Sequence, residues 1–290
     1  MKAGGGETPA PKGKGLGGEK LNTEKLKAEK LDAAGLKAPG LKAAGLNILA
    51  VDTTSDFLSL AVMKGGVPGD APYEALGRRM AREILPRIDA LLKGAGLKAE
   101  ELDLLLVARG PGSFTGTRIG MGVAQTFAQV LEIPLLGVDT LTLLAAQTDP
   151  GESRPFHVAL NCARDEVYHA RFRWKDGIAQ MEGAIALRRL ETLVPEIGDA
   201  PVMLRRFGKE DGRAPGNHTA ARPAANSRDP DTERRFAALN EMSPVHPRPD
   251  GKRLLAVGAP RFLARREGPW PPVLPLYLKS EAFRTWKGRP

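Results

Sequence analysis

The amino-acid sequence predicts an α/β protein of two domains, with sheets flanked by helices. An apolar run at 102–108 leads into a glycine-rich stretch at 109–120 and then into a helical pattern that ends near Leu131, which gives a strand, a loop and a helix in succession. Short strand patterns open both halves of the chain in the same way, at 48–63 and at 156–172. A hydrophobic fraction of 42% over 290 residues is enough for two modest cores.

The first domain is expected over residues 47–150. Residues 48–51 form a short buried strand, residues 57–63 form a second strand, and the polar stretch 52–55 connects them. Residues 79–93 follow as a helix with Pro86 inside it. The apolar residues of this helix gather on one side: Ile84, Ile88 and Leu91, with Leu85 and Leu92 beside them.

The second domain is expected over residues 151–290. Residues 156–160 and 167–172 have the strand patterns of a hairpin. Residues 208–250 are rich in proline, arginine and aspartate and show little hydrophobic periodicity, so an insertion that forms a mobile loop is expected there.

The first 46 residues, 1–46, form a low-complexity extension that is expected to be disordered. Leucine recurs every five residues from Leu21 to Leu46, and a five-residue step turns a helix by about 140°, so these leucines cannot line one face. Nine lysines and five acidic residues give the extension a charge of +4, out of +9 for the chain. Such a basic tail attracts nucleic-acid phosphate weakly, and the alternative is a solvated tail without a ligand.

Composition indicates a cytoplasmic protein. Cys162 is the single cysteine, so an internal disulfide is impossible. No apolar run approaches the roughly 20 residues of a membrane span, and no signal-peptide pattern follows Met1. No association with a membrane is expected.

The glycine-rich stretch is the most informative segment of the chain. A strand, a glycine loop and a helix N-terminus point backbone N–H groups at one spot, which suits an anion or a closely approaching backbone. The stretch has no Walker lysine, and Thr115 stands where a dinucleotide motif needs its third glycine. A tight structural turn without a ligand is the alternative. The candidate residues of this loop are Gly110, Gly112, Ser113, Thr115 and Gly116.

Metal and peptidase chemistry are not expected. The four histidines are His157, His169, His218 and His246, and no two of them lie three to five residues apart, so a helical metal-binding pair is excluded. His157 and His169 can still meet across the predicted hairpin, where a structural pair is favoured over a ligand pair. Ser113 lacks the glycine-flanked pattern of a nucleophile elbow.

Five short motifs together carry a resemblance to a known family. They are Asn-Ile-Leu-Ala-Val-Asp-Thr-Thr at 47–54, the glycine-rich stretch at 109–120, Gly-Val-Asp-Thr-Leu at 137–141, Asp-Glu-Val-Tyr at 165–168 and Leu-Tyr-Leu-Lys at 276–279. On these motifs the chain resembles the TsaB (YeaZ) family of bacterial tRNA threonylcarbamoyladenosine biosynthesis proteins over essentially all of residues 47–290. The resemblance implies an actin-like (ribonuclease-H-like) two-domain fold with mixed sheets.

The same resemblance implies a non-catalytic partner role. In this family the subunit pairs as a heterodimer with TsaD, which transfers the threonylcarbamoyl group, and TsaE is the ATPase of the complex. The modified tRNAs read codons that begin with A, and contact with tRNA is indirect. A subunit that is alone can form a homodimer. The alternative class is an actin-like small-molecule kinase or ATPase.

Site residues follow from the resemblance only in part. By position, Asp52, Thr53 and Thr54 correspond to the turn that faces the phosphates in actin-like ATPases, although any polar turn can have this composition. An actin-like ATPase also needs a carboxylate in the second domain, where this chain has an asparagine. No catalytic residue, metal or cofactor is therefore expected. Three positions depart from the residues that are common in the family: Asn161, Ala163 and Met80.

The helix after the glycine loop is expected to carry the partner surface. Its bulky face is assigned to the domain's own sheet and its small-residue ridge to the partner, because a ridge without side chains lets another helix approach closely. The reverse assignment is the alternative, since small residues also serve tight packing of a helix on a sheet. The ridge consists of Gly116, Gly120, Ala124 and Ala128. The bulky face consists of Ile119, Val123, Phe127 and Val130.

Overall fold

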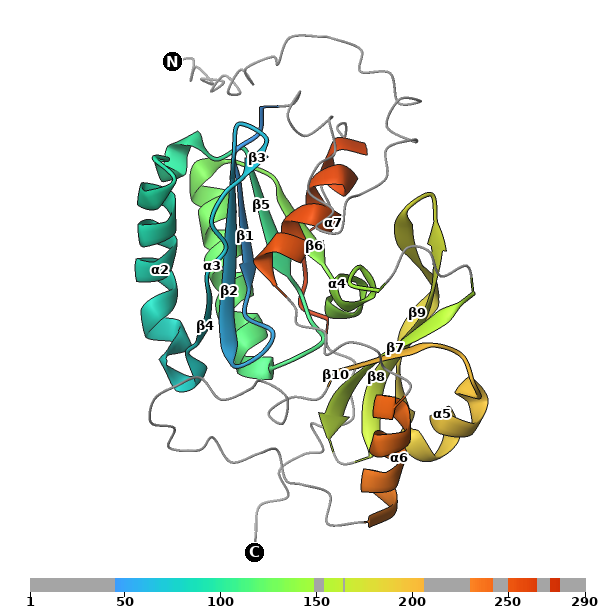
Figure 1. The fold of residues 1–290 in the computed structure, drawn as a ribbon. Coiled ribbons are helices and arrows are strands. Elements are labelled where there is room, and N and C mark those ends of the chain that lie inside the picture. The colour runs from blue at the N-terminus through green and yellow to red at the C-terminus, as the bar shows by residue number, and fades with distance from the viewer. Residues whose placement is uncertain are drawn as a thin grey trace, which may run out of the picture.

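The structure, a computed structural model of the chain, describes residues 45–148, 154–163, 165–205, 230–241, 250–264 and 272–276. Two sheets lie beside each other, and helices flank both of them (Figure 1). The chain therefore has the mixed α/β fold that the sequence predicts.

The first sheet is built from strands of the N-terminal half. Their bounds are Ile48–Asp52 (β1), Phe57–Lys64 (β2), Val67–Pro68 (β3), Tyr73–Ala75 (β4), Leu104–Ala108 (β5) and Leu135–Val138 (β6). The order is β3-β2-β1-β5-β6, and β4 pairs with β2 outside this path. β1 is antiparallel to β2 and parallel to β5, and β6 continues the parallel part.

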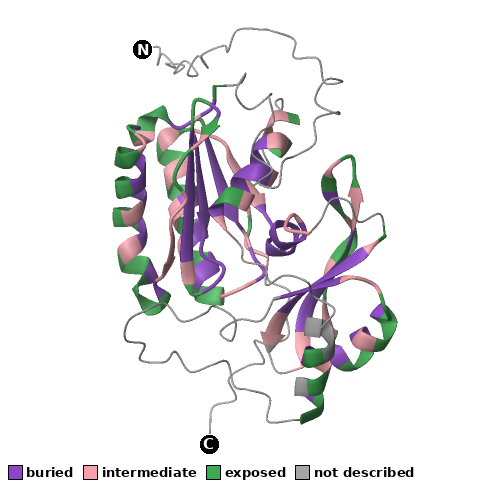
Figure 2. Ribbon diagram, viewed as in Figure 1, coloured by how far each residue is buried: buried purple, intermediate pink, exposed green. Residues whose placement is uncertain are grey.

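Both faces of the first sheet are buried, which explains the apolar runs of its central strands. Every residue of β1 and β5 is buried, and alternate side chains enter two separate cores. Leu49 and Val51 belong to the core below α2 (Met80–Gly94) and α3 (Phe114–Leu131). Ile48 and Ala50 belong to the opposite core, below α7 (Gly251–Ala264). Figure 2 shows the buried strands in purple between the two helix layers.

The C-terminal part of the chain returns to the first sheet, which corrects the expected second domain at 151–290. α7 lies across β1 and β5 (Figure 1). A Cβ on Gly258 would approach Leu106 Cδ2 to 2.7 Å, so helix and sheet are in close contact. Further along, the Leu276 N–H donates to the Arg109 carbonyl at 2.8 Å. A sheet with apolar residues on both faces needs a second helix layer, and α7 provides it. Its core residues are Leu254, Leu255 and Ala259.

The second sheet repeats the strand order of the first. Its strands are Phe156–Ala163 (β7), Glu166–Lys175 (β8), Ile178–Arg189 (β9) and Val202–Arg205 (β10). The order is β10-β7-β8-β9, with β7, β8 and β9 antiparallel and β10 parallel to β7. In the first sheet, four neighbouring strands have the same order and the same relative directions: β5, β1, β2 and β3. This repetition is the actin-like, ribonuclease-H-like arrangement that the family resemblance implies.

Short helices connect and cover these strands. α4 (Thr140–Ala145) is buried throughout and contacts β7 and β9, and α5 (Leu190–Ile197) connects β9 to β10. α6 (Pro230–Glu241) packs against α5 and β10. Two 3-10 turns, η2 (Gly77–Arg79) and η3 (Ala99–Glu101), stand before α2 and before β5.

Two segments that were expected to lack structure contribute to the cores. Leu46, assigned to the 1–46 extension, is buried with β1, and its carbonyl accepts a hydrogen bond from the Gly66 N–H at 2.8 Å. α6 lies inside the expected mobile loop at 208–250, where Phe236 is buried against the second sheet. Thr232 of the same helix is buried as well, so α6 packs on the domain although the surrounding sequence is polar. Residues 1–44, 206–229 and 242–249 lie outside the described residues.

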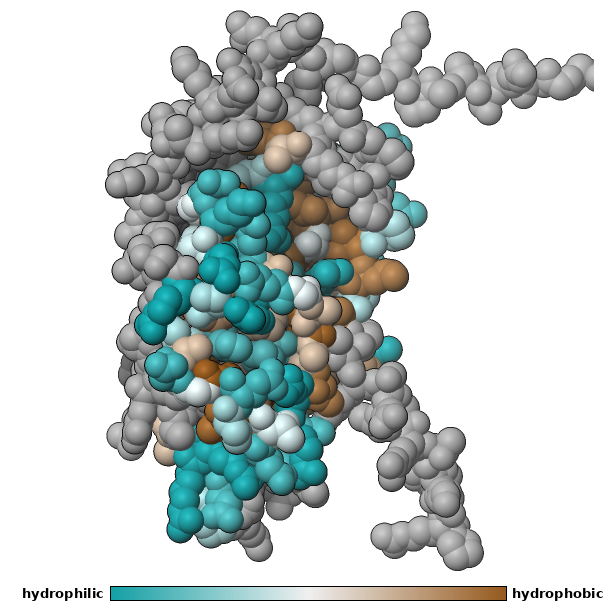
Figure 3. All heavy atoms as spheres, turned by 90° about the vertical axis from the view of Figure 1, so that its right-hand side faces the viewer, coloured by the Kyte–Doolittle hydropathy of each residue, from teal (hydrophilic) through white to brown (hydrophobic). Residues whose placement is uncertain are grey.

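The side of the molecule that lies on the right of Figure 1 faces the viewer in Figure 3. Hydrophilic residues dominate its lower part, where the second sheet and its helices lie, and a hydrophobic area lies in its upper part. In the second sheet, Arg173 Nε lies 2.7 Å from Glu182 Oε1. Within the described residues, no helix combines the length and the apolar character needed to cross a membrane.

Candidate functional site

The glycine loop connects β5 to α3 at the carboxyl end of the first sheet. Ser113 is the N-cap of α3, and its Oγ accepts a hydrogen bond from the Gly116 N–H at 3.2 Å. The Ser113 N–H donates to the Thr54 carbonyl at 2.7 Å, so the loop is tied to the β1–β2 turn. Gly110 has a φ of +91°, a conformation that favours glycine. The loop thus has the strand, turn and helix geometry that the sequence predicts.

The glycines of this loop provide space for Thr53 and Thr54. A Cβ on Gly112 would approach the Thr54 carbonyl oxygen to 2.2 Å, and one on Gly116 would approach the Thr53 carbonyl oxygen to 2.1 Å. Thr53 Oγ1 also donates to the Gly116 carbonyl at 2.7 Å. The close approach that the glycines permit is therefore used by the chain's own backbone.

Asp52, Thr53 and Thr54 form a closed, buried turn. Their side chains are at most 2% exposed. Asp52 Oδ1 accepts hydrogen bonds from the Thr54 N–H at 2.8 Å and from Thr54 Oγ1 at 2.7 Å, which is the pattern of an Asx turn. The structure brings these three residues together with Gly110, Gly112, Ser113 and Gly116. Thr115, the remaining loop candidate, is exposed on the first turn of α3.

The corresponding turn of the second domain begins at Asn161, near the end of β7. The strand register shifts between Asn161 and Ala163, which marks an irregularity in the pairing with β8. Asn161 and Cys162 are half-buried. Burial and a hydrogen bond with Cys162 raise the pKa of Tyr168, so its hydroxyl stays protonated at neutral pH. An asparagine amide supplies no negative charge to this turn.

His157 and His169 meet across the β7–β8 hairpin, as their spacing allows. His157 Nδ1 lies 2.8 Å from His169 Nε2, and the stacked rings have centroids 5.1 Å apart. Burial lowers the pKa of both side chains, and that of His169 falls to about 4. At neutral pH the pair is therefore uncharged and shares one hydrogen bond. Among the described residues, no three His, Cys, Asp or Glu side chains are grouped to hold a metal ion.

The small-residue ridge of α3 faces the chain's own sheet, so its assignment to a partner is wrong. Gly116, Gly120 and Ala124 are buried, and Ala124 packs with Val107 of β5. A Cβ on Gly120 would approach Thr53 Oγ1 to 2.1 Å. The physical reason is the short distance between α3 and the β1–β2 turn, which leaves no room for side chains on this face. Ala128, at the end of the ridge, is half-buried.

The bulky face of α3 is turned toward α2 instead. Ile119, Val123 and Phe127 are half-buried against the core that α2 shares with the sheet. Between the two helices lies a groove of about 460 Å³, whose apolar lining is accompanied by four exposed charged residues: Asp89, Lys93, Lys98 and Glu100. Phe127 lines it from α3, and most of its other apolar walls come from α2 and the segment that follows: Leu85, Ile88, Leu92, Leu97 and Ala99. The sequence analysis did not identify α2 as an interaction surface. Leu85, which lies beside the buried stripe of α2, was the available signal, because its large apolar side chain is 51% exposed.

The chain is similar to the tRNA threonylcarbamoyladenosine biosynthesis protein TsaB of Escherichia coli (strain K12). The two are 32% identical over 215 residues, which are 70% of this chain and 92% of the relative. The chain belongs to the TsaB family. TsaB of Haemophilus influenzae is 31% identical over 147 residues, 46% of this chain and 62% of that protein. Family membership supports a role in the biosynthesis of threonylcarbamoyladenosine in tRNA.

Solved structures of this family have the same fold. YeaZ from Pseudomonas aeruginosa is 27% identical and superposes with a TM-score of 0.58 over 80% of this chain and 100% of that chain. A Pseudomonas aeruginosa protein described as similar to peptidase YeaZ is 26% identical, with a TM-score of 0.60 over 80% and 99% of the two chains. The family model described as TsaD, tRNA N6-adenosine threonylcarbamoyltransferase, matches residues 59–200 of this TsaB-family chain.

Proposed function

We propose that this TsaB-family chain is a non-catalytic subunit that pairs with a TsaD-family subunit. The pair makes N6-threonylcarbamoyladenosine in the cytoplasm, in tRNAs that read codons beginning with A, and a TsaE-family ATPase completes the complex. The TsaD-family subunit transfers the threonylcarbamoyl group. The TsaB-family chain binds that subunit and holds it in its active arrangement.

The observation that carries this proposal is the exposed apolar groove between α2 and α3. Exposure of the apolar side chains of Leu85 and Phe127 to water is unfavourable, and an apolar helix face that covers the groove removes this exposure. The TsaD family model matches residues 59–200, which include both helices. A TsaD-family subunit is therefore expected to carry a related helix pair. Two such pairs pack face to face as a small helix bundle, so the partner supplies the missing apolar surface.

The packing of the glycine loop supports a non-catalytic role. An actin-like ATPase needs open space at this loop for phosphates, whereas here Thr53 and Thr54 pack against Gly112, Gly116 and Gly120. The Asp52 carboxylate accepts hydrogen bonds from Thr54 within its own turn. The alternative reading as a small-molecule kinase or ATPase requires this turn to open.

Binding to a TsaD-family subunit from the same organism tests the proposal. The full chain is expected to form a 1:1 complex on size exclusion. Leu85→Arg places a charge in the groove and is expected to weaken the complex by about tenfold or more. Ile178→Arg is the matched control, because Ile178 is 47% exposed and lies on β9 of the second sheet, whereas α2 packs on the first sheet.

Two results would contradict the proposal. One is a wild-type chain that binds no TsaD-family subunit. The other is a complex that Leu85→Arg and Ile178→Arg leave equally tight. A homodimer of the chain alone is compatible if the TsaD-family subunit displaces it, since both then use the α2–α3 groove.

A further inference from the structure

α2 and α3 begin at the same end of the molecule. Both helices cover one face of the first sheet, and both start at its lower end in Figure 1. Ile88 and Phe127 line the same groove. A step of eight residues back along each helix shifts both by about 12 Å. It leads to Met80 at the start of α2 and to Ile119 in the second turn of α3, so the N-terminal parts of the two helices lie near each other.

Exposed arginines gather at this end. Arg78 and Arg79 lie in η2, Arg82 lies in the first turn of α2, and Arg118 lies in the first turns of α3. All four are exposed. The guanidinium carbon of Arg118 stacks 4.3 Å above the centroid of the Phe114 ring, which is itself 42% exposed. Stacking on an aromatic ring orients a guanidinium and leaves its N–H edges open to a ligand.

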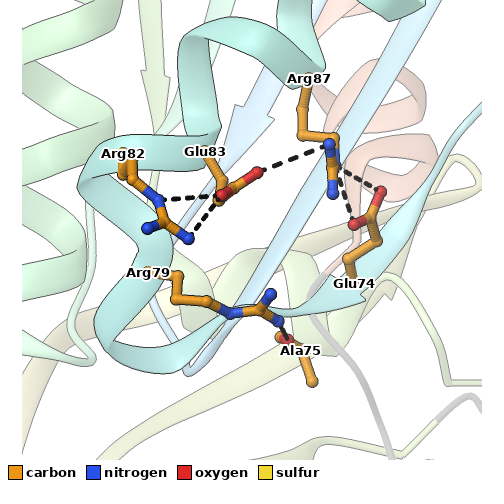
Figure 4. A network of polar contacts seen from close by, with 6 residues as sticks. All are labelled: Glu74, Ala75, Arg79, Arg82, Glu83 and Arg87. Carbon is orange, nitrogen blue, oxygen red and sulfur yellow. Dashed lines mark hydrogen bonds and ion pairs between the residues drawn. The ribbon is translucent and has the colours of Figure 1, made fainter.

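The carboxylates nearby do not neutralise this group. Figure 4 shows that Glu74 and Glu83 bind Arg87 and Arg82, with Arg87 Nε 2.9 Å from Glu74 Oε2 and Arg82 Nη2 3.0 Å from Glu83 Oε1. Arg79 donates to the Ala75 carbonyl at 3.4 Å. In the part of the chain that the structure describes, no carboxylate lies within ion-pair distance of Arg78, Arg79 or Arg118. Asp56 also lies at this end, where its backbone carbonyl accepts a hydrogen bond from the Gly77 N–H at 2.8 Å.

Arg78, Arg79 and Arg118 thus have no carboxylate partner among the described residues, and the N-terminal ends of two helices add positive potential. We infer that Arg78, Arg79 and Arg118 form a contact surface for the phosphodiester backbone of tRNA. Arginine suits this role because its planar guanidinium binds phosphate oxygens in a bidentate manner. The inference rests on the proposed function, which supplies tRNA as the nucleic acid. It adds a direct contact of this chain with tRNA, where the family resemblance implied an indirect one.

The surface lies at one end of the α2–α3 groove. A TsaD-family subunit in the groove leaves the exposed ends of both helices at the rim of the interface. A tRNA on the complex can then contact the arginines beside the subunit that carries out the transfer. Contacts of this kind position the nucleic acid and carry no base specificity.

The salt dependence of tRNA binding tests the inference on the full chain in complex with its TsaD-family subunit. The triple variant Arg78→Ala, Arg79→Ala, Arg118→Ala is expected to weaken tRNA binding by about tenfold or more. It is also expected to reduce the slope of log K against log salt by about 2, since each lost phosphate contact contributes about 0.7–0.9. The control variant Arg173→Ala, Arg189→Ala, Arg234→Ala removes the same net charge from arginines that are paired with carboxylates. It is expected to leave affinity and slope near the wild-type values.

Several outcomes would overturn the inference. The first is a triple variant with wild-type affinity and slope, and the second is an equal loss in both variants, which would indicate only an effect of net charge. The third is a triple variant that loses its TsaD-family subunit and keeps tRNA, which would make the surface a protein contact. Failure of the proposed function can be distinguished from failure of this inference, because in that case the wild-type chain binds no TsaD-family subunit. The effect of the triple variant on tRNA binding is then measured with the chain alone.

Discussion

Gly120 of α3 lies against Thr53 of the β1–β2 turn, so close that a Cβ on the glycine would come within 2.1 Å of Thr53 Oγ1. The contact joins a helix to a turn that is 67 residues earlier in the chain. It fixes the height of α3 above the sheet. That height in turn decides which face of the helix is buried and which face meets α2.

Gly120→Ala is expected to destabilise the chain by about 1–3 kcal/mol, because the added methyl group requires Thr53 or the helix to move. Gly122→Ala is the matched control on the same helix, since a Cβ there meets nothing within 4 Å. The control is expected to stabilise the helix by up to about 1 kcal/mol, the difference in helix propensity. Urea unfolding of both variants measures the effect, and equal stabilities would show that the contact does not exist.

A double-mutant cycle with Thr53→Ala identifies the cause of the strain. Thr53→Ala alone loses the hydrogen bond to the Gly116 carbonyl and costs about 1 kcal/mol. In that background Gly120→Ala is expected to cost less than in the wild type, because Oγ1 is gone. Additive losses would place the strain elsewhere.

Acid is expected to destabilise the second sheet through its histidine pair. The folded-state pKa of His169 is about 4 against an ordinary value of 6.5, and that of His157 is lowered as well. Below pH 6.5 the unfolded chain binds protons that the folded chain does not, so stability is fully present above pH 6.5 and is lost as the pH falls toward 4. The slope is up to about 1.4 kcal/mol per pH unit for each histidine. Urea midpoints over this range measure the loss.

His169→Gln keeps a hydrogen-bonding side chain opposite His157 and removes one titrating group. The loss of stability on acidification is expected to be shallower in this variant. The charged groups around the pair are Arg171, Arg188 and Glu196, and the variant leaves all three in place. An unchanged pH dependence would mean that other groups cause the acid sensitivity.

Phe236→Ala is expected to destabilise the chain by about 3–5 kcal/mol, because the ring is 1% exposed in the core of α5, α6 and the second sheet. Phe114→Ala serves as a control for the same residue type, since this ring is 42% exposed, and less than about 1 kcal/mol is expected. Thermal unfolding of the two variants compares them. Equal melting temperatures would show that α6 does not pack on the sheet.

Local patterns in the sequence were sufficient to predict β1, β2 and β5 of the first sheet and its glycine loop. β1 and β5 are continuous apolar runs, which is the pattern of strands that are buried on both faces. The glycines and Ser113 indicate a tight connection into a helix, and Ser113 is the N-cap. The β7–β8 hairpin also followed from its strand patterns, and the spacing of His157 and His169 allowed the contact across it that the structure shows.

The remaining features depend on contacts between distant segments. The ridge and the bulky face of α3 are both compatible with burial, and only the position of Thr53 decides between them. The return of α7 to the first sheet is not encoded in its own periodicity, because an apolar helix face does not specify which sheet it covers. The α2–α3 groove requires the relative placement of two helices, and each helix alone reads as an ordinary amphipathic element.

Reconstituted modification of tRNA tests the central claim most directly. The TsaD-family subunit, the TsaE-family ATPase and the substrates are combined with the wild-type chain, with Leu85→Arg or with Ile178→Arg, and threonylcarbamoyladenosine in tRNA is measured. The wild-type chain and Ile178→Arg are expected to support equal rates of modification. Leu85→Arg is expected to support a rate that is lower by about tenfold or more, and this rate is expected to recover at high concentrations of the variant. Full activity without the chain, or with Leu85→Arg at limiting concentration, would contradict the account.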